Sequence, residues 1–147
     1  MVLKNTKAKN ILAGGSFIYL NGNAEIEELI YPYGNDGALY INELINGVLL
    51  DNDEHSIEIN DFSKAKAVFS ISNYAPKTGY NNVFPFGVIC KIVRDITPEI
   101  DDAYIKEYYA DDEEALDYSL ELETQIINND NKMSLLIAEL NKYINVT

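Results

Sequence analysis

The residue types that could bind a metal ion gather at one place in the chain, Asp51-Asn52-Asp53-Glu54-His55. Oxygen ligands at alternate positions are typical of a calcium loop, which also needs glycine at its sixth position and a bidentate glutamate at its twelfth. Ser56 and Phe62 stand at those positions. A zinc site would need more ligands than the one His and the one Cys of this chain supply. We therefore interpret the segment as a polar turn between two strands and predict no metal site.

Covalent and cofactor chemistry has equally little support. The single cysteine, Cys90, lies in the apolar run 88–93, where a small buried hydrophobic residue is the ordinary role, and His55 is far from it in the sequence. Gly14-Gly15-Ser16 lacks the spacing of a nucleotide-binding loop. We predict no catalytic residues and no cofactor, and we expect a non-enzymatic protein.

The net charge of −13 is concentrated in one stretch. Residues 95–123 hold twelve acids and one base, a net of −11, so that the remainder of the chain is near neutral. A field of this kind attracts basic partners and repels nucleic acid. It is typical either of a solvated helix face or of a docking surface for a basic partner, and both interpretations stay open at this point.

If the acidic stretch is a docking surface, carboxylates and interleaved aromatic rings would make the contacts. In the special case of nucleic-acid mimicry, the carboxylates would occupy the places of phosphates and block a DNA-binding protein. The candidate partner-binding acids are Asp101, Asp102, Glu107, Asp111, Asp112, Glu113, Glu114, Asp117 and Glu121. The candidate partner-binding aromatics are Tyr104, Tyr108, Tyr109 and Tyr118.

The elements that must position these residues divide the chain in two. Residues 56–62 alternate polar and apolar, as a half-buried strand does, and 65–71 and 83–93 are also predicted strands. Residues 24–31 could be a strand or one short helix. Residues 38–50 partly fit a helix, but Asn46-Gly47 between apolar pairs favours a hairpin. We predict an antiparallel β unit over about residues 10–94.

Helical patterns begin near residue 95. Thr97-Pro98-Glu99 is typical of a helix start, and apolar residues at near-heptad spacing over 133–144 predict a last helix. Two or three helices are expected over about residues 98–145. The predicted fold class is α+β, in a single domain of residues 1–147 with a β-rich part (1–94) and an acidic helical part (95–147).

Composition and segment lengths suggest the setting. Ten Lys to one Arg, with seventeen Asn and eighteen Ile, reflect AT-rich codons and indicate a low-GC bacterium or a virus of one. No signal peptide is visible, and the longest apolar runs are much shorter than the roughly 18 residues of a membrane span. We expect a protein of the infected bacterial cytoplasm or of an assembled virion, with no membrane contact and no direct nucleic-acid binding.

Two functions follow as expectations. The first is a structural or assembly component of a phage or virus, in which a basic N-terminal strip (Lys4, Lys7, Lys9) and the acidic stretch offer opposite charges to neighbouring subunits, including copies of this chain in a homo-oligomer. The alternative is an acidic nucleic-acid mimic that inhibits a DNA-binding host-defence enzyme.

Overall fold

The computed structural model describes residues 1–33, 37–51, 56–70, 82–97 and 126–146. The chain divides into two compact units, Met1–Pro85 and Phe86–Thr147. Whether these two units form the single domain expected from the length stays a prediction. The strands of the first unit are β1 (Val2–Leu3), β2 (Thr6–Gly14), β3 (Phe17–Tyr33), β4 (Ala38–Asp51), β5 (Ser56–Ser70) and β6 (Val83–Phe84).

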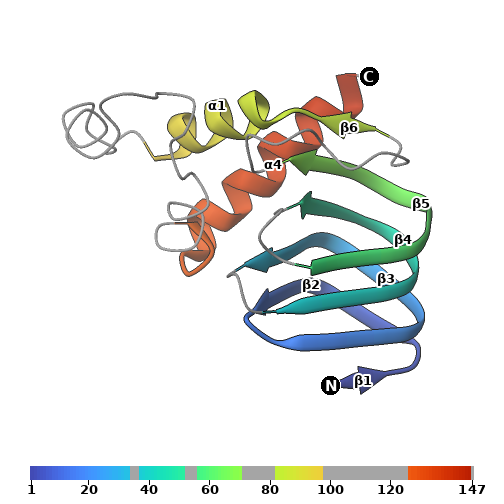
Figure 1. The fold of residues 1–147 in the computed structure, drawn as a ribbon. Helices are drawn as coiled ribbons and strands as arrows, with labels where there is room; N and C mark the ends of the chain where they lie inside the picture. The colour runs from blue at the N-terminus through green and yellow to red at the C-terminus, as the bar shows by residue number, and fades with distance from the viewer. Residues whose placement is uncertain (34–36, 52–55, 71–81, 98–125, 147) are drawn as a thin grey trace. The chain divides into compact units, whose positions relative to one another are not determined.

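The strands of the first unit form one parallel sheet that is wound into stacked coils. β1 and β2 both pair with β3, and the order then continues through β4 and β5 to β6, with every pair parallel. β3, β4 and β5 each run to a bend and turn back, so that the two halves of a strand face each other (Figure 1). This arrangement resembles a β-solenoid. The predicted antiparallel unit is wrong, and so is the α+β class with two or three helices after it. Within 98–145 the described residues contain one helix, which begins at Asp130.

The Asn46-Gly47 pair explains part of the error. Both residues have positive φ, 59° and 69°, which is the conformation that an Asn-Gly hairpin turn would use. Here the pair lies inside β4, where the strand bends and continues, and β4 pairs with its neighbouring coils rather than with itself. Asn46 and Gly47 therefore form a bend within one strand, and residues 38–50 are neither a hairpin nor a helix.

The core of this unit consists of apolar columns that run from coil to coil. In the longest, each residue is the Cα partner of the next: Ile11, Ile30, Leu49, Val68 and Val83. A second column on the facing half contains Leu3, Leu20, Ile41 and Ile59. Both columns contribute to the same buried cluster, because the two halves of each coil point their inward side chains at each other.

The two halves of a strand differ in their sequence pattern. In the first half of β4 the inward Leu39 and Ile41 are buried, and the alternating Tyr40 and Asn42 are partly exposed. This alternation is typical of a sheet with one face exposed to solvent. In the second half the continuous run 48–50 is buried on both faces, and 29–31 and 67–69 in the adjacent coils behave alike. Continuous apolar runs are typical of parallel strands covered on both sides.

Extra residues interrupt the stacking at two places in β3. Between Leu3 and Thr6 lie two residues, but between their partners Leu20 and Ala24 lie three, and a second extra residue falls between Ile26 and Leu29. An extra residue of this kind leaves a backbone group without its ladder partner. Asn21-Gly22-Asn23, a sequence typical of a turn, thus forms the first of these two bulges inside a strand.

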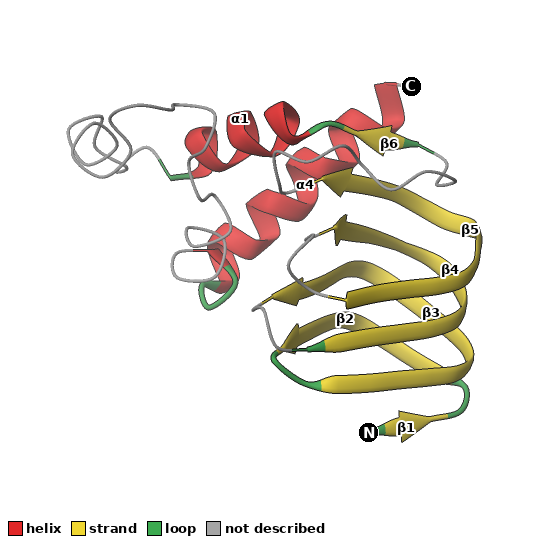
Figure 2. Cartoon of the chain, viewed as in Figure 1, coloured by secondary structure: helices red, strands yellow, loops and turns green. Residues whose placement is uncertain are grey.

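The second unit contains two described helices, α1 (Phe86–Ile96) and α4 (Asp130–Val146), drawn as coiled ribbons in Figure 2. Ile89, Ile92, Val93 and Ile96 are buried at helical spacing along α1, so the strand predicted over 83–93 survives only as Val83–Phe84. α4 confirms the predicted last helix, with Leu136 and Leu140 on its buried side.

Side chains at the ends of these helices satisfy backbone groups. Thr97 donates its hydroxyl to the carbonyl of Val93 at 2.5 Å and so closes the last turn of α1. The helix predicted to start at Thr97-Pro98-Glu99 would lie in 98–125, outside the described residues, and stays a prediction. Asn129 accepts the backbone N–H of Lys132 through Oδ1 at 3.1 Å, which makes it the N-cap of α4. The region between these two helices, 98–125, lies outside the described residues.

Candidate interaction face

The outward side of the first strand halves carries a row of exposed aromatic residues. Phe17 and Tyr19 alternate with inward residues of β3, and Tyr19 is the Cα partner of Val2 on one side and of Tyr40 on the other. Parallel partners point to the same face of a sheet, so these side chains share one surface. We name it the lateral face and define it by Val2, Phe17, Tyr19, Tyr40, Asn42, Glu58 and Asn60.

The lateral face is open to solvent at one end and held by side-chain contacts at the other. Val2 is 65% and Phe17 60% exposed, which is unusual for large apolar side chains. The rings of Tyr19 and Tyr40 lie 6.3 Å apart between centroids and are tilted by 34°. Asn60 donates through Nδ2 to the hydroxyl of Tyr40 at 3.2 Å and to Oδ1 of Asn42 at 3.3 Å. These contacts fix the aromatic row on a rigid scaffold.

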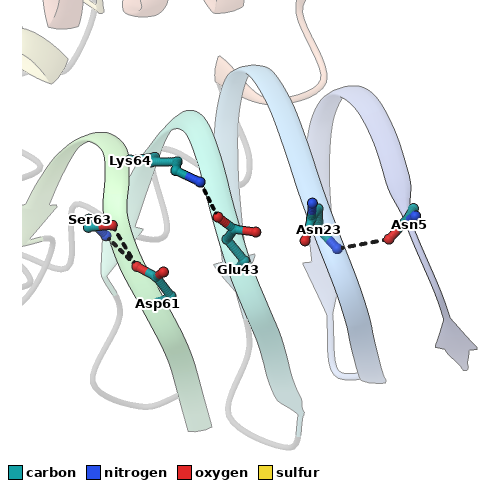
Figure 3. A network of polar contacts seen from close by, with 6 residues as sticks. All are labelled: Asn5, Asn23, Glu43, Asp61, Ser63 and Lys64. Atoms are coloured by element: carbon teal, nitrogen blue, oxygen red, sulfur yellow. Dashed lines mark hydrogen bonds and ion pairs between the residues drawn. The ribbon is translucent and has the colours of Figure 1, made fainter.

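Polar side chains line the bend next to the lateral face. Figure 3 shows Asn5, Asn23, Glu43, Lys64, Asp61 and Ser63 side by side across four successive coils. Asn5 accepts the backbone N–H of Asn23 at 3.1 Å, and Lys64 forms an ion pair with Glu43. The polar side chains of the bend are thus paired with one another or with the backbone of the adjacent coil.

Two groups in this bend have shifted pKa values. The hydroxyl and the backbone N–H of Ser63 both donate to Asp61, at 2.7 and 3.0 Å, and these bonds lower the pKa of the Asp61 carboxyl. The carboxylate of Glu43 raises the pKa of the Lys64 ammonium. Both groups therefore stay charged at neutral pH. On α1, Asp95 raises the pKa of Lys91 in the same way.

The residues predicted to bind a partner lie outside the described part of the chain. All nine acids and all four tyrosines of the prediction fall in 98–125, outside the described residues, and Asp53, Glu54 and His55 lie outside them as well. Within the described ranges, no group of three or more His, Cys, Asp or Glu side chains is arranged to hold a metal ion. The acidic docking surface stays a prediction.

Sequence reasoning missed the lateral face, although a signal was present. Phe17 and Tyr19 occupy alternate positions of one strand, and Tyr40 lies on the next coil at the position that pairs with Tyr19. The abundance of Tyr in the sequence does not by itself align these residues, because the coil length is not known before the strands are paired.

Neither the family models, nor the curated proteins, nor the solved structures include a match to this chain. Among the described residues, no helix is both long and apolar enough to span a bilayer.

Proposed function

We propose that the chain is a non-enzymatic protein that acts through protein–protein contacts, as a structural or assembly component. The lateral face is the surface that meets a neighbouring subunit in this proposal. Its phage or viral setting rests on the AT-rich residue usage alone. The neighbouring subunit is taken to be another copy of this chain, which gives the proposal a direct test.

The observation that carries the proposal is the exposure of large apolar side chains in a row. Single exposed apolar residues are ordinary, but a contiguous group rimmed by polar residues is typical of an interaction surface. Val2, Phe17 and Tyr19 form the group, with Asn42, Asn60 and Glu58 beside it. Aromatic residues are also enriched at the centres of protein interfaces.

The rigidity of the scaffold supports the same proposal. The aromatic row is carried by strands that pair on both sides in β3 and β4, and Tyr40 is held by Asn60. A surface that is already ordered loses little conformational freedom on association. The lateral face can therefore bind through a modest area of apolar contact.

The test is the oligomeric state of the full chain and of a variant carrying Phe17→Ser and Tyr19→Ser. Both substitutions fall on exposed outward positions, so the buried columns are unchanged. Sedimentation velocity over a range of concentrations should show a discrete oligomer for the natural chain and a shift to monomer for the variant.

Leu135→Ser provides the matched control, because Leu135 is 51% exposed on α4, in the other unit. It should leave the oligomer intact. A natural chain that sediments as a monomer at every concentration would rule out assembly of this chain with itself. An oligomer that persists in the Phe17/Tyr19 variant would remove the lateral face from the contact.

The alternative, an acidic mimic of nucleic acid, is favoured by one sequence observation, the net charge of −11 in residues 95–123. Reversal of Asp111, Asp112, Glu113 and Glu114 to Lys should then abolish binding to a basic DNA-binding protein. The affinity of the natural chain should also fall steeply as salt screens the charges. Binding that survives the reversal would reduce the acidic stretch to a solvated face.

A further inference from the structure

Exposed apolar and exposed polar residues lie toward opposite ends of the stack, near β1 and near β5 (Figure 1). Among the described residues of the first unit, the large apolar side chains that are exposed all fall in positions 1–19: Met1, Val2, Leu3, Leu12, Phe17 and Tyr19. Every exposed residue of β5 is polar: Ser56, Glu58, Asn60, Asp61, Ser63, Lys64 and Lys66. The stack therefore has an apolar end and a polar end.

The lateral face follows the same gradient from coil to coil. Two columns of successive Cα partners run across it: Val2, Tyr19, Tyr40 and Glu58 in one, and Phe17, Ala38 and Ser56 in the other. Each column begins with a large apolar side chain and ends with a polar one. The centres of protein interfaces are depleted in charged residues, so the β1 and β3 end of the lateral face is the part suited to burial.

Two copies that meet through the same face are related by a two-fold axis, and two directions of this axis keep their strands aligned. If the axis runs along the stack, each coil lies on its own counterpart, and Glu58 opposes Glu58 of the second copy. If the axis runs along the strands and the faces overlap fully, Glu58 opposes Val2 of the second copy. The first arrangement brings like charges together, and the second buries a carboxylate against an apolar side chain, so both cost free energy.

A third arrangement avoids both costs. The axis again runs along the strands but lies between β1 and β3, so that β1 of each copy faces β3 of the other. Val2 then lies against Tyr19 of the second copy, because the two residues share one column. The contact occurs twice, since a two-fold axis uses the same patch on both copies. The β4 and β5 coils of the two copies extend beyond the contact on opposite sides, and Glu58 stays in water.

We infer that two copies overlap only at the β1 and β3 end of their lateral faces, about a two-fold axis, with the β5 coil of each copy outside the contact. The inference rests on the proposed function, since it names the part of the lateral face that is buried and the surface that lies against it. A contact limited to two strands of each copy is smaller than a standard interface, so the dimer should be weak and reversible.

Substitutions at the two ends of one column separate the three arrangements. Glu58→Gln removes a charge and keeps the size of the side chain, and it should leave the dissociation constant of the dimer within about twofold of the natural value. In either of the other arrangements it should tighten the dimer, because a carboxylate would leave the contact. Val2→Gln should raise the dissociation constant roughly tenfold or more, because an apolar contact that occurs twice is lost.

Sedimentation equilibrium over a range of concentrations measures the dissociation constants, and circular dichroism checks that each variant is folded. Glu27→Gln is the matched control for Glu58→Gln, because it removes the same charge from an exposed position of β3 outside the lateral face. It should change the dissociation constant as little as Glu58→Gln does. If Val2→Gln does not fold, Val2→Thr replaces it, with a smaller increase expected because Thr keeps the β-branched shape of Val.

Distances between spin labels test the geometry directly. In a background with Cys90→Ala, Asn21→Cys places a label on β3 and Glu58→Cys places one on β5. In the inferred dimer the β3 strands of the two copies lie one strand spacing apart along the stack and the β5 strands five spacings apart, about 5 and about 24 Å. The coil-on-coil arrangement places both pairs at equal heights, and full overlap reduces the β5 separation to three spacings, about 14 Å.

A β5 separation near five spacings, with a dimer that is weakened by Val2→Gln and unchanged by Glu58→Gln, would support the inference. Equal label distances at the two positions, a β5 separation near three spacings, a tighter dimer in Glu58→Gln or an unchanged dimer in Val2→Gln would each overturn it. These four results leave a dimer of the chain in place. A natural chain that is monomeric at every concentration would instead remove the proposed self-assembly, and the inference with it.

Discussion

Asn10 accepts the backbone N–H of Leu29 through Oδ1 at 2.9 Å and donates through Nδ2 to the carboxylate of Glu28 at 3.2 Å. Leu29 directly follows the second extra residue of β3, where the regular ladder is interrupted. Asn5 accepts the N–H of Asn23 in the same way at the first extra residue. In both places a side-chain amide of the first coil replaces a backbone carbonyl, which keeps a bulged strand bonded to its neighbour.

The two asparagines give a matched pair of stability variants. Asn10→Ala should lower the free energy of unfolding by about 1–3 kcal/mol, because the N–H of Leu29 would lose its acceptor in a partly buried place. Asn5→Ala should cost roughly 0.5–1.5 kcal/mol, because water can replace its exposed bond. Urea unfolding measures both. Equal costs, or a larger cost at Asn5, would contradict the assigned roles.

Gly22 lies where two coils approach closely. A Cβ built there would come within 2.8 Å of the backbone carbonyl carbon of Lys4 and 2.9 Å of the backbone nitrogen of Asn5. Since backbone atoms cannot rotate away, Gly22→Ala should destabilise the β unit by about 1–3 kcal/mol. Gly87→Ala is the control, because nothing lies within 4 Å of its Cβ. Thermal melts should show a lower midpoint for the first variant only.

Leu49 lies in the middle of the longest apolar column, between Ile30 and Val68, and is fully buried. Leu49→Ala should cost about 2–5 kcal/mol, the range observed for truncation of a buried leucine that leaves a cavity. Leu135→Ala on α4 should stay within about 0.5 kcal/mol, because Leu135 is exposed. Comparable losses in the two variants by denaturant titration would argue against the column as the core.

Asp61 provides a test in which pH is the variable. Its carboxyl has a folded pKa below the ordinary value of 3.8, mainly because Ser63 donates to it. The stabilisation by these bonds is therefore present in full above pH 3.8 and is lost as the pH falls through the lower folded pKa. Ser63→Ala should raise the pKa of Asp61 toward 3.8, measured by NMR titration of the carboxyl carbon.

Ser16→Ala serves as the control for this titration. The hydroxyl of Ser16 donates to the carbonyl of Gly14, away from Asp61. The Asp61 titration should be the same in this variant and in the natural chain. An Asp61 pKa that does not move in Ser63→Ala would show that the hydrogen bond from the Ser63 hydroxyl is not its main cause, since the backbone N–H of residue 63 remains in the variant.

Local patterns in the sequence predicted several elements but not how they pair. The alternation over 56–62 lies within β5, and the spacing over 133–144 predicted α4. An alternating strand has one buried face whether its neighbours run parallel or antiparallel, so direction was open, and Asn46-Gly47 favoured the wrong choice. The run 88–93 is apolar enough for a buried strand or a buried helix, which periodicity alone does not separate.

The repeat behind the coils was hidden by the bulges. Val2 pairs with Tyr19, Phe17 with Ala38, and Ala38 with Ser56, and the separation along the chain differs in each of these pairs. The second halves do keep a constant spacing, because Ile11, Ile30, Leu49 and Val68 follow one another at intervals of 19 residues. Sequence reasoning missed this signal, since the repeat is regular over only part of each coil. The lateral face depends on the same alignment, because its aromatic residues come together only when the coils are placed in register.

The coil-by-coil pairing also bears on how this unit acquires its structure. Each strand pairs with the strand of the adjacent coil. The separation in sequence between paired residues is shortest from Val68 to Val83 and longest from Phe17 to Ala38. No pairing therefore has to close a loop across the whole unit. The cost of closing a loop rises slowly with its length, and stacked repeats gain stability one neighbour at a time. Folding can therefore start from any adjacent pair, with β3 and β4 as the central one, and spread outward as each later strand is added to an edge already in place.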